Sequence, residues 1–504
     1  MSNHLEDETS LYLQQHAKDL IDWYPWGEEA LSRAKAEHKP IFLSIGYSSN
    51  FRCKVMEKES FQNEKIAELL NKYFISIKVD KEEYLDINAY YQEVYKLMNR
   101  RVGGSPLSIF MTENLEPFYS ATYISTEAQE AELGFEELLR TISKKYITEY
   151  ETFEEKGKEV LQYINRKEKS IEATKLDLAL LNTIVTHTDT LLDKKNGGFG
   201  TGSKFPNTST LELLLESYQE TKDETLLEAT LLSLNKMEKG EIYDHVHGGF
   251  YRYSRNENWS NPHRVKTTYD NALISQLYIR FFQLTNNQNY KEVAFKTIDF
   301  MLTQMSKEGL FFAKKDETQN EEAIDKTIIT SWNAMMVSTL FKASTVDEKY
   351  KSIAIESLDT LLNTVYINQT LYRNSSLKIE GFLEDYAYLG EALIEAYQAT
   401  NNEGYLHLAT EFANKLIEVF YNYAQWNLSN SSFKIKVGIY DTDYPSALST
   451  ACSLLLKISS LVDNTYKKFV FNTLELHSYT IMRQPLSSPK LTQVTLNYLI
   501  GKNI

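Results

Sequence analysis

The 504-residue chain contains only two cysteines, Cys53 and Cys452. Two cysteines cannot build a disulfide scaffold or a cysteine-rich zinc site, and they suit a reducing compartment. Glycine and proline are also scarce, with 19 and 9 residues, about half of their usual combined share of roughly 12%. This scarcity excludes a turn-rich all-β protein and favours long helices.

Basic residues are outnumbered, and long apolar runs are absent from the sequence. Lysine and arginine total 54 against 69 acidic residues, so the net charge is −15. Because nucleic-acid binding needs a surplus of basic residues, nucleic acid is not expected as a main partner. No run approaches the ~18 apolar residues that cross a bilayer, and residues 1–10 lack the basic and apolar regions of a secretory signal. We therefore expect a cytoplasmic protein that does not associate with membranes.

The length predicts two to four domains, and the first third alternates short apolar runs with helical stretches. Strands are predicted at 41–46, 74–80, 106–111 and 116–124, with helices at 55–70, at 86–98 and from 134 onward. Strands and helices that alternate in this way over about 150 residues predict an α/β sandwich.

Cys53 follows the first predicted strand, at the start of a helix. A helix N-terminus stabilises a thiolate, so a cysteine at this place can be reactive. The alternative is a buried, inert cysteine, because free cysteine is among the most buried residue types. Thiol–disulfide exchange within one site also needs a second sulfur, normally as Cys-x-x-Cys, and this chain has Asn50 there. Cys452 lies in a different predicted domain, so dithiol oxidoreductase activity is not expected.

Three segments of the front third are closely similar to the spermatogenesis-associated protein 20 family. They are residues 10–30 (SLYLQQHAKDLIDWYPWGEEA), 39–48 (KPIFLSIGYS) and 103–107 (GGSPL). The resemblance continues through nearly all of the chain, and the DWYPW motif at 22–26 is its most specific element. It implies a thioredoxin-like front domain in which Pro106 is a cis proline.

The resemblance also marks this chain as a degenerate member. The family has Cys-His-Trp-Cys-His where this chain has Asn50-Phe51-Arg52-Cys53-Lys54. Only the second cysteine of the thioredoxin motif is present, so the resemblance implies a conserved fold without the ordinary redox cycle.

Residues 141–172 are strongly charged and helical in pattern, with no wide apolar stripe. Such a segment predicts a solvated connecting helix. We place the domain boundary near 165–175, with a thioredoxin-like domain at 1–165 and a second domain at 172–504.

An internal repeat extends through the second domain. Apolar helical stretches end in similar tetrads whose last residues are Thr221, Thr285, Ser344, Thr400 and Ser460, at spacings of 64, 59, 56 and 60. A polar turn and a second helical stretch follow each tetrad. About 60 residues suits two helices of ~20 residues with their connections, so the repeat predicts an array of helical hairpins.

An open solenoid and a closed ring both fit such an array. Solenoid repeats of one helix pair are usually shorter, roughly 34 residues. The long repeat, with elaborate loops at only one end of each hairpin, favours a closed α/α toroid. The family resemblance likewise implies six hairpins, similar to sugar-active hydrolases and epimerases. The predicted fold is thus a thioredoxin-like α/β sandwich followed by an α/α toroid of the six-hairpin glycosidase type.

The long loops would converge on one mouth of the toroid. Aromatic faces and carboxylates gathered there suit sugars, whose CH faces are apolar and whose hydroxyls need acceptors. Glycoside hydrolysis needs two carboxyl groups, and epimerisation needs a proton shuttle such as histidine. Helix capping is the alternative role for Asp270 and Asp385, and a loop role is the alternative for each histidine. His245 and His247 have no third ligand spaced to complete a zinc site, so no metal or other cofactor is expected.

From this reasoning the predicted catalytic residues are His263, Asp270, Asp385 and Asp244 at the mouth, with Cys53 as the residual thioredoxin-site cysteine. The predicted ligand-binding residues are Lys204, Phe205, His247, Tyr253, Trp259, Tyr269, Asn271, Trp332, Glu384 and Tyr386. The family's glutamate within 263–271 is Val265 here, and family members usually run longer at the C-terminus. We expect a thioredoxin-like protein without dithiol activity whose toroid binds a sugar-like ligand. An active epimerase or hydrolase, a monothiol redox protein acting through Cys53, and an interaction scaffold are the alternatives.

Overall fold

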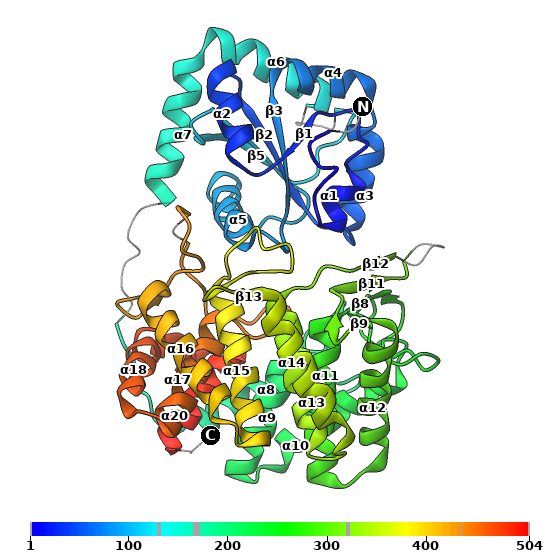
Figure 1. Ribbon diagram of the computed structural model, residues 1–504, viewed down its shortest axis with the longest axis vertical. Coiled ribbons are helices and arrows are strands. Elements are labelled where there is room, and N and C mark those ends of the chain that lie inside the picture. Colours follow the sequence, from blue (N-terminus) through cyan, green and yellow to red (C-terminus); the bar gives the residue numbers. More distant parts are fainter. Residues whose placement is uncertain (1–2, 129–132, 165–171, 319–322, 434, 502–504) are drawn as a thin grey trace. The chain divides into compact units, whose positions relative to one another are not determined.

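A computed structural model describes residues 3–128, 133–164, 172–318, 323–433 and 435–501. The chain divides into two compact units, Met1–Lys169 and Ser170–Ile504 (Figure 1), and each is considered by itself. The boundary expected between 165 and 172 falls on residues outside the described ranges.

The first unit is built on a five-stranded sheet in the order β1-β3-β2-β4-β5. The strands are β1 (Trp23–Pro25), β2 (Ile41–Gly46), β3 (Ile75–Asp80), β4 (Leu107–Met111) and β5 (Pro117–Ala121). β1, β3 and β2 run parallel, whereas β4 and β5 are antiparallel to their neighbours. β2, β3 and β4 are buried along their whole length, although β3 alternates apolar residues with Ser76, Lys78 and Asp80. This topology matches the predicted thioredoxin-like sandwich.

Helices cover the sheet of the first unit (Figure 1). They are α1 (Leu11–Gln15), α2 (Glu28–Glu37), α3 (Phe51–Met56), the π-helix η1 (Glu57–Phe61), α4 (Glu64–Tyr73), α5 (Leu85–Asn99), α6 (Phe135–Thr148) and α7 (Tyr150–Ile164). The prediction of one helix over 55–70 is wrong. The chain turns at Gln62, and the Asn63 side chain accepts hydrogen bonds from the Lys65 and Ile66 amides to begin α4.

The prediction of a solvated connecting helix after residue 141 is also wrong. The segment forms two helices, and the second, α7, packs against β5 and α5. Phe153 lies 4.6 Å from Phe118, ring centre to ring centre, and Gly157 and Val160 are buried. These three positions form a stripe one residue wide, too narrow to stand out among the surrounding charges.

The second unit contains a closed ring of inner helices (Figure 1). Each inner helix contacts the next, and the last contacts the first. In ring order they are α9 (Thr208–Thr221), α11 (Thr268–Thr285), α13 (Thr330–Ser344), α15 (Leu383–Thr400), α17 (Ala447–Leu461) and α20 (Pro489–Ile500). Outer helices pack against them: α8 (Ala179–Leu191), α10 (Glu224–Lys239), α12 (Gln288–Gln304), α14 (Lys349–Val365), α16 (Glu403–Lys415), α18 (Lys467–Leu476) and α19 (Ser478–Arg483). The ring closure identifies the predicted toroid and excludes an open solenoid.

Three of the five repeated tetrads, those ending in Thr221, Thr285 and Thr400, are followed by the same turn between an inner and an outer helix. After Thr285, for example, Asn286 adopts the left-handed conformation at φ 54°, and the side chain of Asn287 caps the next helix. Asn401 and Asn402 repeat this turn after Thr400. A residue that tolerates positive φ followed by an N-cap residue is what a two-residue helix–helix turn requires.

At the other end of the hairpins, longer loops carry short strands and helical turns. These are β6 (Tyr253–Ser254), β7 (Pro262–His263), β8 (Val265–Thr267), β9 (Ser306–Lys307), β10 (Leu310–Phe311), β11 (Lys314–Asp316), β12 (Ala323–Asp325), β13 (Tyr366–Ile367), β14 (Thr370–Leu371), η2 (Leu416–Phe420), β15 (Tyr421–Asn422), β16 (Gln425–Trp426), η3 (Asn464–Tyr466) and η4 (Pro485–Ser487). The N-termini of inner helices α9, α11, α13, α15 and α17 follow directly on these loops, which places their first residues at the mouth of the ring.

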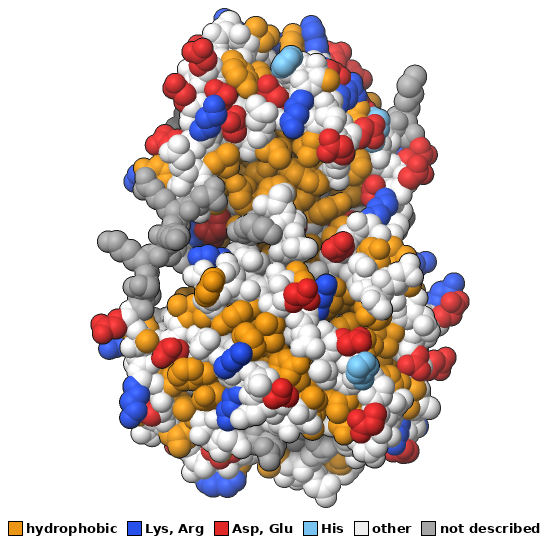
Figure 2. Space-filling view, turned by 60° about the vertical axis from the view of Figure 1, so that its left-hand side comes forward, with side chains coloured by type: hydrophobic (Ala, Val, Ile, Leu, Met, Phe, Trp, Pro, Cys, Tyr) orange, Lys and Arg blue, Asp and Glu red, His pale blue; other side chains and the backbone are white. Residues whose placement is uncertain are grey.

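Charged side chains of both signs are distributed over the surface. Figure 2 shows acidic and basic side chains interspersed on one face, without a continuous basic area among the residues described there. Among the described residues, no helix combines the length and apolar character needed to cross a membrane.

Candidate functional site

The thioredoxin position of the first unit holds a single buried thiol. Asn50 caps α3, and its Oδ1 accepts a hydrogen bond from the Cys53 amide at 3.0 Å. Cys53 is only 3% exposed, and burial raises the pKa of its thiol, opposite to the direction expected for a reactive cysteine. Cys452 is buried in the second unit, where burial raises its pKa to about 12. Pro106 follows a cis peptide bond, as the family resemblance implied.

Restoring the missing sulfur is expected to create dithiol chemistry. Asn50→Cys rebuilds Cys-x-x-Cys at a side chain that already reaches the first turn of α3. Insulin reduction in the presence of a thiol reductant should be at background for the wild type and rise clearly for the variant. Ser49→Cys, which adds a neighbouring thiol outside the motif, should stay at background. Strong activity of the wild type would contradict this account of the site.

One pocket lies at the mouth of the toroid. Its empty volume, open solvent at its mouth included, is about 540 Å³. It is lined by the start of α9, by Asp270 of α11, by the loop before α17, by Leu486 of η4 and by Pro489, the first residue of α20. The lining residues are Phe205, Pro206, Asn207, Thr208, Ser209, Thr210, Asp270, Asp441, Thr442, Asp443, Leu486 and Pro489. Two predicted site residues, Phe205 and Asp270, are therefore brought together.

Asp270 lies in the first turn of α11, which Thr267 caps, and lines the pocket. The hydroxyl of Thr267 accepts a hydrogen bond from the Asp270 amide at 3.2 Å and donates one to Asp270 Oδ2 at 2.6 Å. Burial raises the pKa of Asp270 to about 8, an effect that Thr267 and Arg252 oppose and the nearby Asp443 increases. The carboxyl group is therefore mostly protonated at neutral pH.

The elevated pKa of Asp270 should make stability pH-dependent. The pKa of Asp270 in the unfolded chain is ~3.9, so the folded chain binds this proton more tightly. The contribution of this proton to the free energy of unfolding is complete below pH ~4. It is lost as pH rises through about 8. Urea unfolding of wild type and Asp270→Asn at pH 4 to 9 isolates the effect, because the variant removes only this group. As pH rises from 4 to 9, the free energy of unfolding of the wild type should fall relative to that of Asp270→Asn by an amount on the order of a few kcal/mol. Parallel curves of unfolding free energy against pH would contradict the raised pKa of Asp270.

Two further aspartates complete the pocket. Arg252 Nη2 donates to both Asp443 carboxylate oxygens, at 2.9 and 2.8 Å. Asp441 accepts hydrogen bonds from the amides of Ser446 and Lys490, each at 2.8 Å, and burial raises its pKa to about 6. Neither Asp441 nor Asp443 was among the site residues predicted from the sequence. The available signal was a pair of acids two residues apart before an inner helix.

The pocket offers hydrogen-bond donors as well as acceptors. α9 begins after Asn207, whose backbone is left-handed at φ 47° and whose side chain does not cap the helix. Thr208, Ser209 and Thr210, in the first turn of α9, line the same pocket as the three carboxyl groups. Donors at a helix N-terminus therefore face acceptors from two other segments.

An aromatic stack stands beside the carboxyl groups. Phe205 stacks on Tyr253 with ring centres 4.8 Å apart, and Tyr253 stacks on His263 at 4.9 Å. Phe205 remains 39% exposed and lines the pocket, whereas His263 is buried behind it. The predicted residues Tyr253 and His263 thus support the pocket wall without lining it.

Several other predicted residues hold the mouth loops in place. Burial would raise the pKa of Asp244, but Lys266 Nζ at 2.6 Å and the loop amides lower it to about 2. Lys204 donates to Asp193 Oδ2 at 2.5 Å, and Asn271 exchanges hydrogen bonds with the Phe250 backbone. These contacts give structural roles to Asp244, Lys204 and Asn271, and to Trp259, whose indole donates to the Asn196 carbonyl. His247 is exposed, 3.4 Å from Asp244.

A second set of predicted residues surrounds the buried Arg373. Its Nη1 donates to Glu384 Oε1 at 2.7 Å and to Asp385 Oδ1 at 2.8 Å. Asp385 also caps α15 by accepting from the Phe382 amide at 2.9 Å, so the capping alternative holds in place of the catalytic one. Burial raises the pKa of Asp385 to about 6, against the effect of Arg373.

The predicted aromatic residues Tyr269, Trp332 and Tyr386 pack against other side chains and do not line the pocket. The Tyr269 and Trp332 rings are 4.8 Å apart, and Tyr386 lies 5.3 Å from Phe412 in the layer of the outer helices. None of these three, nor Glu384, is among the residues that line the pocket.

Comparison of the sequence confirms the resemblance predicted from its motifs over 62% of the chain, less than the nearly complete extent expected. Residues 2–165 match the family model Thioredox_DsbH, described as a protein of unknown function, DUF255. The uncharacterized protein B0495.5 of Caenorhabditis elegans is 36% identical over 320 residues, which cover 62% of this chain and 44% of that protein. Spermatogenesis-associated protein 20 of Homo sapiens is 36% identical over 323 residues, 62% of this chain and 41% of that protein. The aligned region thus spans less than half the length of these relatives.

Solved structures confirm the toroid fold. A sugar epimerase from a ruminal bacterium superimposes with a TM-score of 0.52 at 11% identity, covering 65% of this chain and 100% of that one. A D-mannose isomerase superimposes with a TM-score of 0.51 at 12% identity, covering 65% of this chain and 98% of that one. At these identities the likeness is one of fold alone.

Proposed function

We propose that the second unit binds a carbohydrate in the pocket lined by Phe205, Asp270, Asp441 and Asp443. The observation that carries this proposal is the combination of an exposed aromatic face with three carboxyl groups in one concave site. A sugar ring has apolar CH faces that pack on aromatic rings. Its hydroxyls donate and accept hydrogen bonds, and the pocket supplies acceptors from the aspartates and donors from the start of α9.

Glycoside hydrolysis is the reaction that the carboxyl groups favour. It needs one protonated carboxyl as general acid and one ionised carboxyl on the other side of the scissile bond. Asp270 is held protonated by burial, and Asp443 pairs with the Arg252 guanidinium. In this proposal Asp270 is the general acid and Asp443 the second carboxyl group. Epimerisation through histidine is less well supported, because no histidine is among the described lining residues.

For the first unit, we propose a thioredoxin-like module without dithiol exchange. Asn50 occupies the place of the attacking sulfur, and burial opposes ionisation of the Cys53 thiol. The same burial argues against the monothiol alternative, since the thiolate is the nucleophile. Two buried, unpaired cysteines suit a reducing compartment such as the cytoplasm.

A thermal-shift screen against neutral mono- and oligosaccharides tests the binding proposal. At least one saccharide should raise the unfolding temperature of the wild type in a saturable way. Phe205→Ala should lose most of this shift. Phe471→Ala, which truncates an equally exposed phenylalanine on α18, should retain it. A panel without any stabilising saccharide, or equal shifts in both variants, would contradict the proposal.

A further inference from the structure

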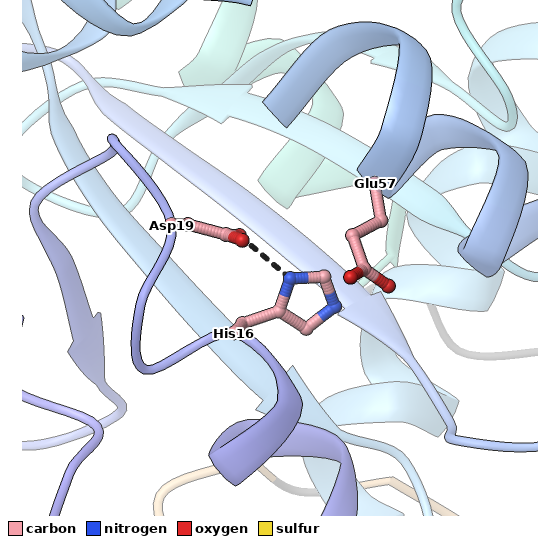
Figure 3. A group of neighbouring side chains, drawn as sticks. All are labelled: His16, Asp19 and Glu57. Atoms are coloured by element: carbon pink, nitrogen blue, oxygen red, sulfur yellow. Dashed lines mark hydrogen bonds and ion pairs between the residues drawn. The ribbon is translucent and has the colours of Figure 1, made fainter. Parts of the chain in front are cut away.

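Three side chains of metal-ligand type meet inside the first unit, outside the proposed carbohydrate site. His16 follows α1, Asp19 lies in the next loop, and Glu57 is the first residue of the π-helix η1. One potential ligand atom from each lies within 4.8 Å of the others, and Figure 3 shows the three side chains turned toward one another. His16 and Asp19 are buried, whereas Glu57 is partly exposed, which leaves one side of the cluster open to an entering ion.

The His16 ring is oriented as metal-binding histidines are. Its Nδ1 lies 2.7 Å from Asp19 Oδ2, which also accepts a hydrogen bond from the Trp23 indole at 3.0 Å. Because a carboxylate only accepts, Nδ1 carries the proton and Nε2 presents a lone pair. Figure 3 shows the Nε2 edge of the ring facing Glu57. A carboxylate on the far nitrogen is the usual outer partner of a ligating histidine.

A buried lysine, Lys78, lies near this cluster. Its side chain is fully buried, and Nζ has no hydrogen-bond acceptor among the described residues. Nζ lies 4.2 Å from the Trp23 ring centre and 4.1 Å from that of Phe61. Burial lowers the pKa of Lys78 to about 8, against the effect of Asp19, Cys53 and Glu57. Burying an ammonium without a hydrogen-bond acceptor costs free energy. The Lys78 ammonium offsets the charge of these carboxylates, but it makes no hydrogen bond to their oxygen atoms.

The backbone that presents Glu57 is itself unusual. η1 is a single π-helical turn between α3 and α4, and such turns are frequent at functional sites. The same turn carries Phe61, which packs on Lys78. One irregular segment therefore shapes both the carboxylate and the surroundings of the buried ammonium.

We propose that the first unit binds a first-row divalent cation between His16 Nε2 and the Glu57 carboxylate, with Asp19 orienting the imidazole. Imidazole and carboxylate ligands suit Zn²⁺ and its neighbours. Ca²⁺ needs six to eight oxygen ligands, more than this cluster offers. The Lys78 ammonium opposes the incoming ion by charge and limits its affinity. This site is independent of the toroid and of the carbohydrate proposal.

Isothermal titration of the full chain with Zn²⁺ tests the site, with Ca²⁺ as the comparison ion. The wild type should bind Zn²⁺ in a saturable step near one ion per chain and Ca²⁺ far more weakly. His16→Ala and Glu57→Gln should each lose this step, and Asp19→Asn should weaken it by about 10- to 100-fold. Glu64→Gln, at an exposed acid on α4, and His407→Ala, at an exposed histidine of the second unit, should bind as the wild type does. If His16→Ala fails to fold, the partly exposed Glu57→Gln decides.

Lys78→Met separates a metal site from a purely structural cluster. Without the ammonium the apo chain should unfold at a lower temperature, because two carboxylates lose their counter-charge. Zn²⁺ affinity should rise by about tenfold or more, since a like charge has been removed, and Zn²⁺ should restore the unfolding temperature. Absence of saturable Zn²⁺ binding in the wild type, binding unchanged by Glu57→Gln, or binding weakened by Lys78→Met would overturn the proposal.

Discussion

Arg373→Met is expected to destabilise the second unit by about 3–5 kcal/mol, the cost of leaving buried charges without their partner. The Arg373 side chain is 1% exposed and pairs with Glu384 and Asp385, which are 8% and 0% exposed. Methionine fills much of the same volume, so the loss is mainly electrostatic. Urea unfolding followed by tryptophan fluorescence measures it.

Two further variants separate charge from packing in this cluster. Lys194→Met removes an exposed lysine whose partner Asp189 is also exposed, so the loss should stay below ~1 kcal/mol. Adding Glu384→Gln and Asp385→Asn to Arg373→Met should recover part of the lost stability, because the isolated negative charges are then gone. A loss below ~1 kcal/mol for Arg373→Met itself would show that the cluster is not essential to the mouth of the toroid.

Asp270→Asn is expected to lower glycoside hydrolysis by about 10²- to 10⁴-fold, the usual contribution of a general acid. The proton that Asp270 retains at neutral pH would pass to the leaving-group oxygen as the glycosidic bond breaks. Asparagine preserves the size of the side chain but cannot supply that proton. The comparison is of kcat for wild type and variant with aryl glycosides of the sugar found to bind.

The leaving group provides the internal control. A dinitrophenolate departs without protonation, so the defect of Asp270→Asn should shrink markedly on dinitrophenyl glycosides relative to alkyl or unsubstituted phenyl ones. An equal defect on both classes would assign Asp270 a structural role. Unchanged kcat on all of them would remove it from the reaction.

Architecture was largely predictable because local patterns determine it. The apolar run at 41–46 and the alternating segment at 75–80 are both fully buried strands. The Thr-Asn-Asn turn at 285–287 recurs at 400–402, where a left-handed residue is again followed by a cap. The closed ring followed from loop lengths that alternate between two ends of the hairpins. α7 was misjudged because only Phe153, Gly157 and Val160 carry its packing, amid charged neighbours.

The residues of the pocket were harder to predict, because the sequence does not show which residues of the mouth loops line it. Glycine, tryptophan and carboxylate motifs mark the right loops, yet Asp244 is engaged by Lys266, and Asp385 by Arg373 and the start of α15. A buried lysine or arginine partner lies 22 residues away for Asp244 and 12 for Asp385, which no local pattern reveals. Asp441 was overlooked for a similar reason, since one of the two amides that hold its carboxyl group, that of Lys490, lies 49 residues away. Burial, which raises the pKa of Asp270 and Asp441, is a property of the closed ring.

The central claim is that a sugar ring rests on the Phe205 face between the three aspartates. Saturation-transfer-difference NMR with a mixture of neutral oligosaccharides tests it most directly, because the signal reports which ligand protons touch the protein. The account predicts transfer to the CH protons of one sugar in the presence of the wild-type chain, and its loss with Phe205→Ala. Absence of transfer to any sugar, or equal transfer in the two proteins, would contradict it.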